Sequence, residues 1–213
     1  MVYRTTAARL DRDLELRERI LASALARVAQ GGFAALTMQA LAEDVGIATG
    51  SLYRHFQGKG ELAAEVFALA SQREVQALGE TLRGPGSPVQ RLRAGLEQFA
   101  ARAWYSRRLA FALIAEPVDP AVDVQRLRFR EAYAELFVAL LGEGVGLGLF
   151  RVQHPNLIAA CLVGAISESL VGPLSPPARA AREAGQVSLE LHDVIQTLVT
   201  FCLRAVGAEE STS

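Results

Sequence analysis

The stretch TMQALAEDVGIATGSLYRHFQGKGEL, from Thr37 to Leu62, decides the fold of this chain. It predicts two short helices joined by a tight turn, followed at once by the start of a third helix. Two helices this short bury little apolar surface by themselves, so such a unit normally presents one helix to a partner. The presented helix carries side chains suited to the major groove of DNA, namely Thr49, Ser51, Tyr53, Arg54 and His55.

Local signals predict the ends of these two helices. Thr37 is a good N-cap for the first helix, whose Leu41 and Val45 should point inward. Gly46 suits a turn conformation that a residue with a Cβ would resist. The second helix is predicted over residues 48–56, with Leu52 and Phe56 on its buried side. Thr49 is open to two interpretations, as a groove contact or as the cap that Ala48 does not provide.

The net charge of the chain gives no support for a general attraction to nucleic acid. The 213 residues carry a formal net charge of -1, so any attraction to phosphate must be local. Arginines crowd the N-terminus among four acidic residues; they are Arg4, Arg9, Arg12, Arg17 and Arg19. This segment is either a solvated first helix or an arm that contacts phosphate.

The helical period runs through the rest of the chain, and no segment shows the strand period. The sequence GPGSP at 84–88 and the prolines at 117, 120 and 173–177 separate the helices. Helices are predicted near residues 14–30, 59–82, 107–116, 121–141, 155–171 and 187–206, with an amphipathic one after Pro88 that carries Leu92 to Ala103. The sequence therefore predicts an all-α protein, with a three-helix head and a larger helical-bundle body.

Several features indicate a soluble protein of the cytoplasm, without a membrane partner. The N-terminus has no apolar core of the kind found in signal peptides. The most apolar run, residues 157–174, is interrupted by Ser167, Glu168 and Ser169, which favours a buried helix over a membrane span. Cys161 and Cys202 lie in apolar patterns typical of buried, reduced thiols.

Residues 36–62 closely resemble the N-terminal domain of TetR-family transcriptional regulators. The match rests on the Thr37 start, Leu41-Ala42, Gly46-Ile47, Leu52-Tyr53, Phe56, Lys59 and Leu62. The resemblance implies a helix-turn-helix DNA-binding domain over residues 1–58 and an effector-binding and dimerisation domain over residues 59–213. It also implies repression of a double-stranded DNA operator, relieved by a small molecule, with no cofactor and no metal.

Roles in DNA binding follow from the resemblance, position by position. Thr37, Met38 and Gln39 would open the helix that straddles the DNA backbone. The residues facing the groove would be Thr49, Gly50, Ser51, Tyr53, Arg54 and His55, and Lys59 would pair with a phosphate. The chemistry of these side chains supports the roles. An arginine such as Arg54 can bind guanine O6 and N7, and the hydroxyls of Tyr53 and Ser51 can bind phosphate oxygens.

The last two long helices, near 155–171 and 187–206, are apolar around much of their circumference. A two-sided apolar helix at the end of a soluble chain needs a second covering surface. In TetR-like proteins this pair of helices forms a four-helix seam with the same pair of another chain. We therefore expect a homodimer that binds a palindromic site, the alternative being one large single-chain core.

The middle of the chain holds aromatic residues that are candidates for an effector pocket. They are Phe99, Trp104, Tyr105, Phe111, Phe129, Tyr133 and Phe137, with Glu116, His154 and Glu168 as possible polar contacts. Such a lining suits an apolar small molecule. The alternative is that these aromatic residues form ordinary core, and that Glu168 pairs with an arginine across the dimer seam.

Two other functions remain as alternatives. A transcriptional activator of the same fold would have the same sequence signals. A helical-bundle enzyme is disfavoured because the glycines at 142, 144, 146 and 148 follow a helix, which suggests a helix end and a flexible link and not a dinucleotide loop. The histidines at 55, 154 and 192 are too scattered for a metal site.

Overall fold

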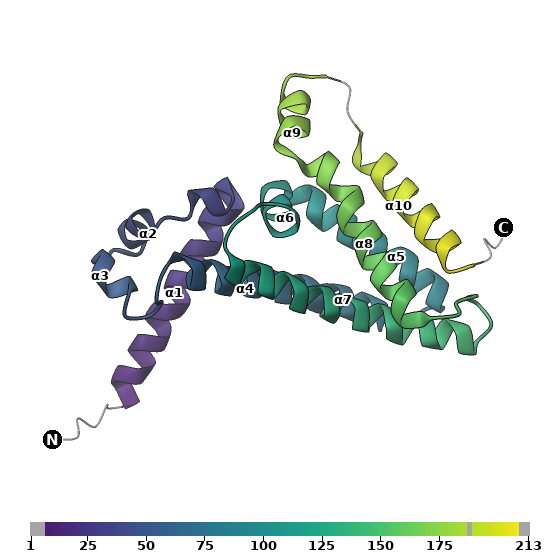
Figure 1. Ribbon diagram of the computed structural model, residues 1–213, viewed down its shortest axis with the longest axis horizontal. Helices are drawn as coiled ribbons and strands as arrows, with labels where there is room; N and C mark the ends of the chain where they lie inside the picture. The colour runs from purple at the N-terminus through teal and green to yellow at the C-terminus, as the bar shows by residue number, and fades with distance from the viewer. Residues whose placement is uncertain (1–6, 187–188, 209–213) are drawn as a thin grey trace.

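A computed structural model describes residues 7–186 and 189–208, and every regular element in that part of the chain is helical. The helices are α1 (Ala7–Gly31), η1 (Phe33–Ala35), α2 (Met38–Val45), α3 (Thr49–Leu52), α4 (Lys59–Leu82), α5 (Pro88–Tyr105), α6 (Arg107–Ile114), α7 (Pro120–Gly146), α8 (Pro155–Leu174), α9 (Pro176–Glu183) and α10 (Leu191–Ala205). Figure 1 shows α1, α2 and α3 grouped at one end, with α4 leading into a body of longer helices. The predicted all-α fold with a small head and a helical body is confirmed.

Two clusters of buried side chains hold the molecule together. The head cluster centres on Ile20, Leu41, Leu52 and Phe56, all at most 1% exposed. It also includes Ala112, Val122 and Phe129 of α6 and α7, so the core of the head continues into the body. Apolar burial thus joins the two parts, and a change in one part can be felt in the other.

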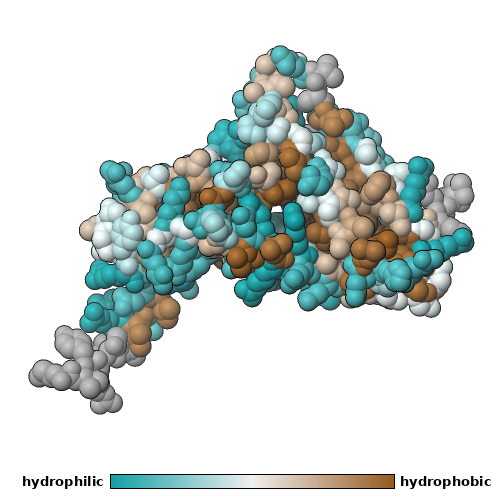
Figure 2. Space-filling view, viewed as in Figure 1, coloured by the Kyte–Doolittle hydropathy of each residue, from teal (hydrophilic) through white to brown (hydrophobic). Residues whose placement is uncertain are grey.

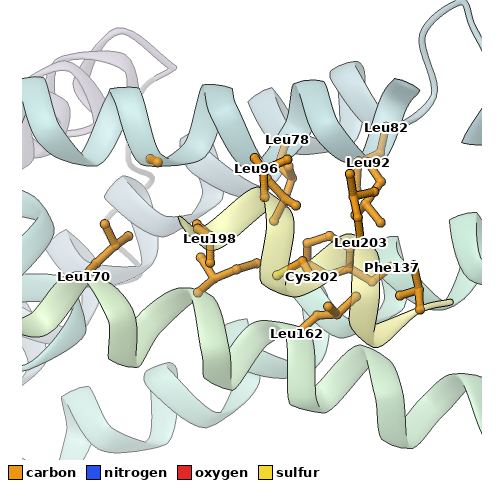
Figure 3. Packing of buried hydrophobic residues seen from close by; sticks show 14 of the residues in the cluster. Leu78, Leu82, Leu92, Leu96, Phe137, Leu162, Leu170, Leu198, Cys202 and Leu203 are labelled. Carbon is orange, nitrogen blue, oxygen red and sulfur yellow. The ribbon is translucent and has the colours of Figure 1, made fainter. Parts of the chain in front are cut away.

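The body cluster lies where α4, α5, α7, α8 and α10 meet. Leu78, Leu96, Phe137, Leu162 and Leu198 point toward one another from these five helices (Figure 3). All five side chains are at most 3% exposed. This packing fixes the framework of the body on which any ligand site depends.

Some predicted helix limits were wrong. The first helix begins at Ala7 and not near residue 14, and Arg4 of the predicted N-terminal arm lies outside the described residues. The recognition helix ends at Leu52, and residues 53–55 form a turn before Phe56. The stretch predicted as 48–56 is therefore one helical turn followed by a tighter turn, in which Arg54 N donates to Ser51 O at 3.2 Å and His55 N to Leu52 O at 2.9 Å.

The glycine-rich end of α7 is helical and not a flexible link. The helix continues through Gly142 and Gly144 to Gly146, and the positive φ of 71° appears only at Gly148. A Cβ on Gly144 would lie 2.0 Å from the ring of Phe150, so the missing side chain lets that ring pack against the helix. Close packing explains this glycine.

The proline-rich segment near residue 175 was predicted as a loop, but it starts a helix. Pro173 lies inside the last turn of α8, and Ser175 caps α9 by accepting a hydrogen bond from Ala178 N at 3.3 Å. Pro176 occupies the first turn of α9, where its missing N–H costs nothing. The last helix starts at Leu191, and residues 187–188 of its predicted range lie outside the described residues.

Helix α8 is apolar but largely uncovered, contrary to the predicted buried helix. It is the one helix of the described chain whose length and composition would allow it to cross a membrane, and only 28% of its most apolar window is buried. Cys161 on this helix is exposed, whereas Cys202 on α10 is buried, so the prediction of two buried thiols was wrong for Cys161. Figure 2 shows apolar side chains over the α8 and α10 side of the body.

Candidate DNA-binding head and body cavity

The turn between α2 and α3 has the geometry that its sequence predicts. The Thr37 hydroxyl accepts a hydrogen bond from Ala40 N at 3.2 Å and caps α2. Gly46 ends α2 with φ 74° and ψ 38°, in the left-handed region that glycine adopts without strain. Ile47 N then donates to Ala42 O at 3.0 Å, which turns the chain toward α3.

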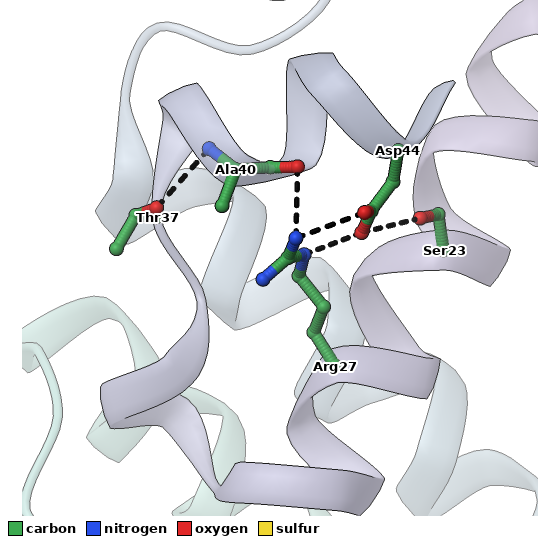
Figure 4. Close-up of polar contacts among 5 residues, drawn as sticks. All are labelled: Ser23, Arg27, Thr37, Ala40 and Asp44. Carbon is green, nitrogen blue, oxygen red and sulfur yellow. Dashed lines mark hydrogen bonds and ion pairs between the residues drawn. The ribbon is translucent and has the colours of Figure 1, made fainter. Parts of the chain in front are cut away.

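An ion pair and main-chain contacts from α1 hold α2 in place (Figure 4). Arg27 forms an ion pair with Asp44, and its Nη2 also donates to Ala40 O at 3.0 Å. The guanidinium beside it lowers the pKa of the Asp44 carboxyl, chiefly through this hydrogen bond. Arg19 donates to Val45 O at 3.1 Å, so both ends of α2 are tied to α1.

Most residues predicted to face DNA lie on the surface of the head. Thr37, Gln39, Gly50, Tyr53, Arg54 and Lys59 are exposed, and Thr49, Ser51 and His55 are half-buried. Arg54 Nη2 donates to Ser51 Oγ at 3.0 Å, so these two side chains stand together. Ala48 is the N-cap of α3 without any side-chain cap bond, so Thr49 does not serve as the cap.

Met38 is an exception among the predicted DNA contacts. Its side chain is only 9% exposed and belongs to the core cluster of the head. It occupies the first position of α2, where the turn toward α1 buries it. The structure therefore gives Met38 a packing role and leaves little of it for contact with a partner.

The body contains a cavity of about 120 Å³ between α4, α5, α6, α7 and α8. Aromatic rings form much of its wall, namely Phe67, Phe99, Phe129, Tyr133 and Phe137. Phe99 and Tyr133 meet edge to face, with ring centroids 5.8 Å apart. Four of the aromatic residues singled out in the sequence, Phe99, Phe129, Tyr133 and Phe137, thus converge on one site.

The other predicted pocket residues do not line this cavity. Tyr105 is 80% exposed, and Glu168 and His154 are exposed as well. Trp104 is buried beside the cation of Arg107, whose Cζ lies 4.6 Å from the ring centroid. Phe111 packs against the body core. Glu116 contacts the head and not the cavity. The sequence pattern alone therefore did not distinguish the residues of the cavity wall from those of the core or of other contacts.

Polar residues that the sequence analysis missed also line the cavity. On α4 they are Ser71 and Glu74, on α5 Arg102, and on α7 Arg126 and Arg130. The helical period was the signal that could have found them. Phe67, Ser71, Glu74 and Leu78 repeat every three or four residues and so share the face of α4 that lines the cavity.

One charged pair spans α4 and α5 at the cavity. Arg102 binds the Glu74 carboxylate with two hydrogen bonds of 2.7 Å, and the pairing raises the pKa of Arg102. Burial raises the pKa of the Tyr133 phenol above its usual value, and the nearby Glu74 carboxylate adds to this effect. Tyr133 therefore keeps its proton at physiological pH and can donate a hydrogen bond.

A short chain of contacts connects the cavity to the head. Arg126 lines the cavity, lies over the ring of Phe67, and donates hydrogen bonds to the carbonyls of Ala112, Leu113 and Glu116 at the end of α6. The carboxylate of Glu116 in turn accepts hydrogen bonds from Phe33 N and Ala34 N of η1, each at 3.0 Å. The end of α6 thus touches both the cavity wall and the head.

A second close approach occurs at the same junction. Asp119 caps α7 by accepting a hydrogen bond from Ala121 N at 2.9 Å. Its carboxylate lies against Gly60 in the first turn of α4, where a Cβ would lie 2.7 Å from Asp119 Oδ2. The starts of α4 and α7 are therefore in direct contact.

The head has a helix-turn-helix whose second helix is exposed, and a larger all-helical body carries it. These two features are typical of helix-turn-helix DNA-binding proteins. The family model described as bacterial regulatory proteins, tetR family, matches residues 20–66, which include the whole α2–α3 unit. Residues 20–66 are therefore similar to the N-terminal DNA-binding domain of TetR-family regulators.

The chain is also similar to one relative in sequence and to two solved structures in fold. The HTH-type transcriptional repressor KstR of Mycolicibacterium smegmatis is 36% identical over 78 residues, covering 37% of this chain and 38% of that protein. The chain thus matches about two fifths of that relative's length. Among solved structures, reduced Escherichia coli NemR superposes with a TM-score of 0.73 at 17% identity, covering 92% of this chain and 98% of that one. The transcriptional regulator FadR from Bacillus subtilis in complex with stearoyl-CoA superposes with a TM-score of 0.70 at 13% identity, covering 89% of this chain and 98% of that one. These two likenesses concern the fold.

Proposed function

We propose that this protein is a ligand-responsive transcriptional repressor of the cytoplasm that binds a near-palindromic DNA operator as a homodimer. The observation that carries the proposal is the α2–α3 unit. Gly46 fixes its turn, Leu52 and Phe56 anchor it in the head, and Tyr53 and Arg54 remain exposed on the outer side. The naming of a matched relative as a repressor supports the direction of regulation.

The exposed residues of the head suit both kinds of DNA contact. The Arg54 guanidinium can form two hydrogen bonds with guanine, while the hydroxyls of Tyr53 and Ser51 suit phosphate oxygens. Gly50 is exposed, and a Cβ there would meet no protein atom within 4 Å, so the main chain at this position is open to a close approach by DNA. Lys59 is exposed in the first turn of α4 and would contact phosphate beside that helix N-terminus.

A homodimer would cover the apolar surface that α8 and α10 leave open. Leu157 on α8 and Phe201 on α10 are 61% and 58% exposed. Along α8, Leu157, Cys161 and Gly164 are exposed at helical spacing, and a Cβ on Gly164 would meet nothing within 4 Å. An exposed stripe of apolar and small residues allows the same helix of a second protomer to approach closely in a two-fold arrangement.

Regulation would run from the cavity to the head. The cavity of about 120 Å³ makes the body the place for an effector in this chain, and one solved structure of the same fold is a complex with a small molecule, stearoyl-CoA. A ligand that displaces Arg126 would disturb the carbonyls at the end of α6 and hence the Glu116 contact with η1. Such a ligand relieves repression if it prefers the conformer that fits DNA poorly.

Selection of bound sequences from random double-stranded DNA tests the proposal. A repressor of this kind enriches a near-palindrome whose half-sites lie one helical turn apart, about 34–36 Å, or a whole number of turns. Failure to enrich any sequence with folded, full-length protein would contradict it.

A further inference from the structure

The charged groups around the cavity are largely occupied by other protein groups. Glu74 and Arg102 pair with each other, and Arg126 binds Asp123 at 2.8 Å as well as three carbonyls. Arg130 is exposed, so its charge lies at the outer edge of the site. A charged ligand group inside the cavity would lose its hydration without finding a free partner of opposite charge.

Among the hydroxyl groups of the cavity wall, those of Ser71 and Tyr133 lie away from the surface and lack such partners. Ser71 on α4 is 4% exposed, and Tyr133 on α7 is half-buried. Among the hydrogen bonds of residues 7–186 and 189–208, none involves either side-chain hydroxyl, and neither hydroxyl is among the fully enclosed polar atoms without a partner. Both can donate and accept, and a polar group that leaves water for an apolar site needs such a partner.

The size of the cavity limits what fits. At about 120 Å³, it approaches the roughly 150 Å³ of an apolar protein cavity that holds one benzene molecule. Phe67, Phe99, Phe129 and Phe137 supply ring faces and edges for an aromatic guest. A long acyl chain would require the surrounding helices to move apart.

We infer that the effector is a compact, uncharged molecule of about one aromatic ring, whose single hydroxyl or carbonyl group binds the Ser71 and Tyr133 hydroxyls. The inference rests on the proposed function, because it assigns the ligand class of the same cavity. It sets this site apart from one for a long-chain acyl thioester, which carries many charges and far more atoms.

Calorimetric titration of the full-length protein with four probes tests this ligand class. The probes are p-cresol, toluene, 4-methylbenzoate and stearoyl-CoA, and p-cresol is uncharged at pH 7 because a phenol has a pKa of about 10. We expect p-cresol to bind most tightly, toluene more weakly and 4-methylbenzoate more weakly still. Three results would each overturn the inference. They are 4-methylbenzoate binding more tightly than p-cresol and losing that affinity in Arg130→Gln, binding of stearoyl-CoA alone, and binding of no probe.

Two variants test the role of the hydroxyls. Tyr133→Phe and Ser71→Ala should each weaken p-cresol binding by about two- to tenfold, the range of one net hydrogen bond, and leave toluene binding within about twofold. Unchanged toluene binding shows that the cavity is intact. Tyr105→Phe is the matched control, since Tyr105 is 80% exposed and lies outside the cavity. Unchanged p-cresol binding in both cavity variants would contradict the assignment.

DNA binding measured on the same preparation separates the two proposals. Protein that binds its selected DNA but no ring compound refutes the ligand class and leaves the proposed function intact. Protein that binds p-cresol but no DNA sequence refutes the proposed function instead.

Discussion

The carboxylate of Glu116 accepts a hydrogen bond of 3.0 Å from the main-chain N–H of Phe33, although the two residues lie 83 positions apart. Gly32, just before η1, has φ 72° and ψ -176°, a backbone region that only glycine adopts readily. A Cβ at this position would lie 2.5 Å from the Glu116 carboxylate. The glycine thus permits both the turn and the approach of Glu116, and the head is held to the body by a specific polar contact as well as by apolar packing.

Replacing Glu116 with glutamine should weaken this contact. The amide retains one acceptor oxygen and loses the charge, so we expect the free energy of unfolding to fall by about 1–2 kcal/mol in urea denaturation. The effect of an effector on DNA affinity should shrink as well, because the head would follow the end of α6 less closely. Glu131→Gln, on an exposed position of α7, is the control. Equal stability of the two variants would show that the contact contributes nothing.

Replacing Arg54 with alanine tests base recognition by α3. We expect operator binding to weaken by about 1–3 kcal/mol and specificity to relax at one base pair of each half-site. A gel-shift series on the selected operator and its single-base variants measures both. Arg128→Ala removes the same charge from an exposed position of α7 and should leave binding nearly unchanged. Uniform weakening on every sequence would instead make Arg54 a phosphate contact.

Replacing Gly164 with arginine should separate the protomers. The position is exposed on α8 and open around its Cβ, so a single protomer tolerates the side chain while a closely packed second copy does not. Sedimentation analysis at micromolar concentration should show a dimer for the parent protein and a monomer for the variant. Gly142→Arg, at an open and exposed position of α7, should remain dimeric. A monomeric parent protein would rule out the seam.

The two cysteines should differ in reactivity in the Gly164→Arg variant. Cys161 is exposed, whereas burial raises the pKa of Cys202 to about 12. Since the thiolate is the reactive form, a thiol reagent at pH 8 should modify Cys161 quickly and Cys202 only after unfolding. Cys161 should react more slowly in the parent dimer. Rapid modification of both thiols in the folded variant would contradict the burial of Cys202.

The Arg27–Asp44 ion pair predicts a dependence of stability on acid. Because the folded-state pKa of Asp44 is lowered, its contribution is complete above the unfolded pKa of about 4 and is lost as pH falls through the folded value. Asp44→Asn should therefore lower the melting temperature at pH 7, and the difference from the parent should shrink in increasingly acidic buffer. Asp13→Asn on the exposed part of α1 serves as the control. A constant difference down to pH 2 would exclude this mechanism.

Local signals predicted much of the fold. Residues 59–82 were predicted as one helix and form α4, because Gly58 precedes the helix and the GPG sequence follows it. Thr37 and Gly46 act as predicted for the same local reason. Helix α9 was missed because Pro176 and Pro177 are typical of loops, and only the Ser175 cap distinguishes a helix start.

The sites were harder to predict because they depend on contacts between distant helices. The aromatic residues of α5 and α7 were found, yet periodicity within one helix could not separate Phe99, in the cavity wall, from Trp104, beside Arg107. Glu116 was predicted as a possible polar contact of the pocket. Its actual partner is the main chain of η1, and main-chain N–H groups leave no trace in the residue pattern.

The contact between Gly60 and Asp119 joins the first turns of two long helices, α4 and α7. The clearance at position 60 admits a hydrogen atom but no methyl group. Any larger residue at position 60 would have to displace the Asp119 carboxylate that caps α7. The fit between the starts of α4 and α7 thus depends on the smallest side chain at one position and on a helix cap at the other.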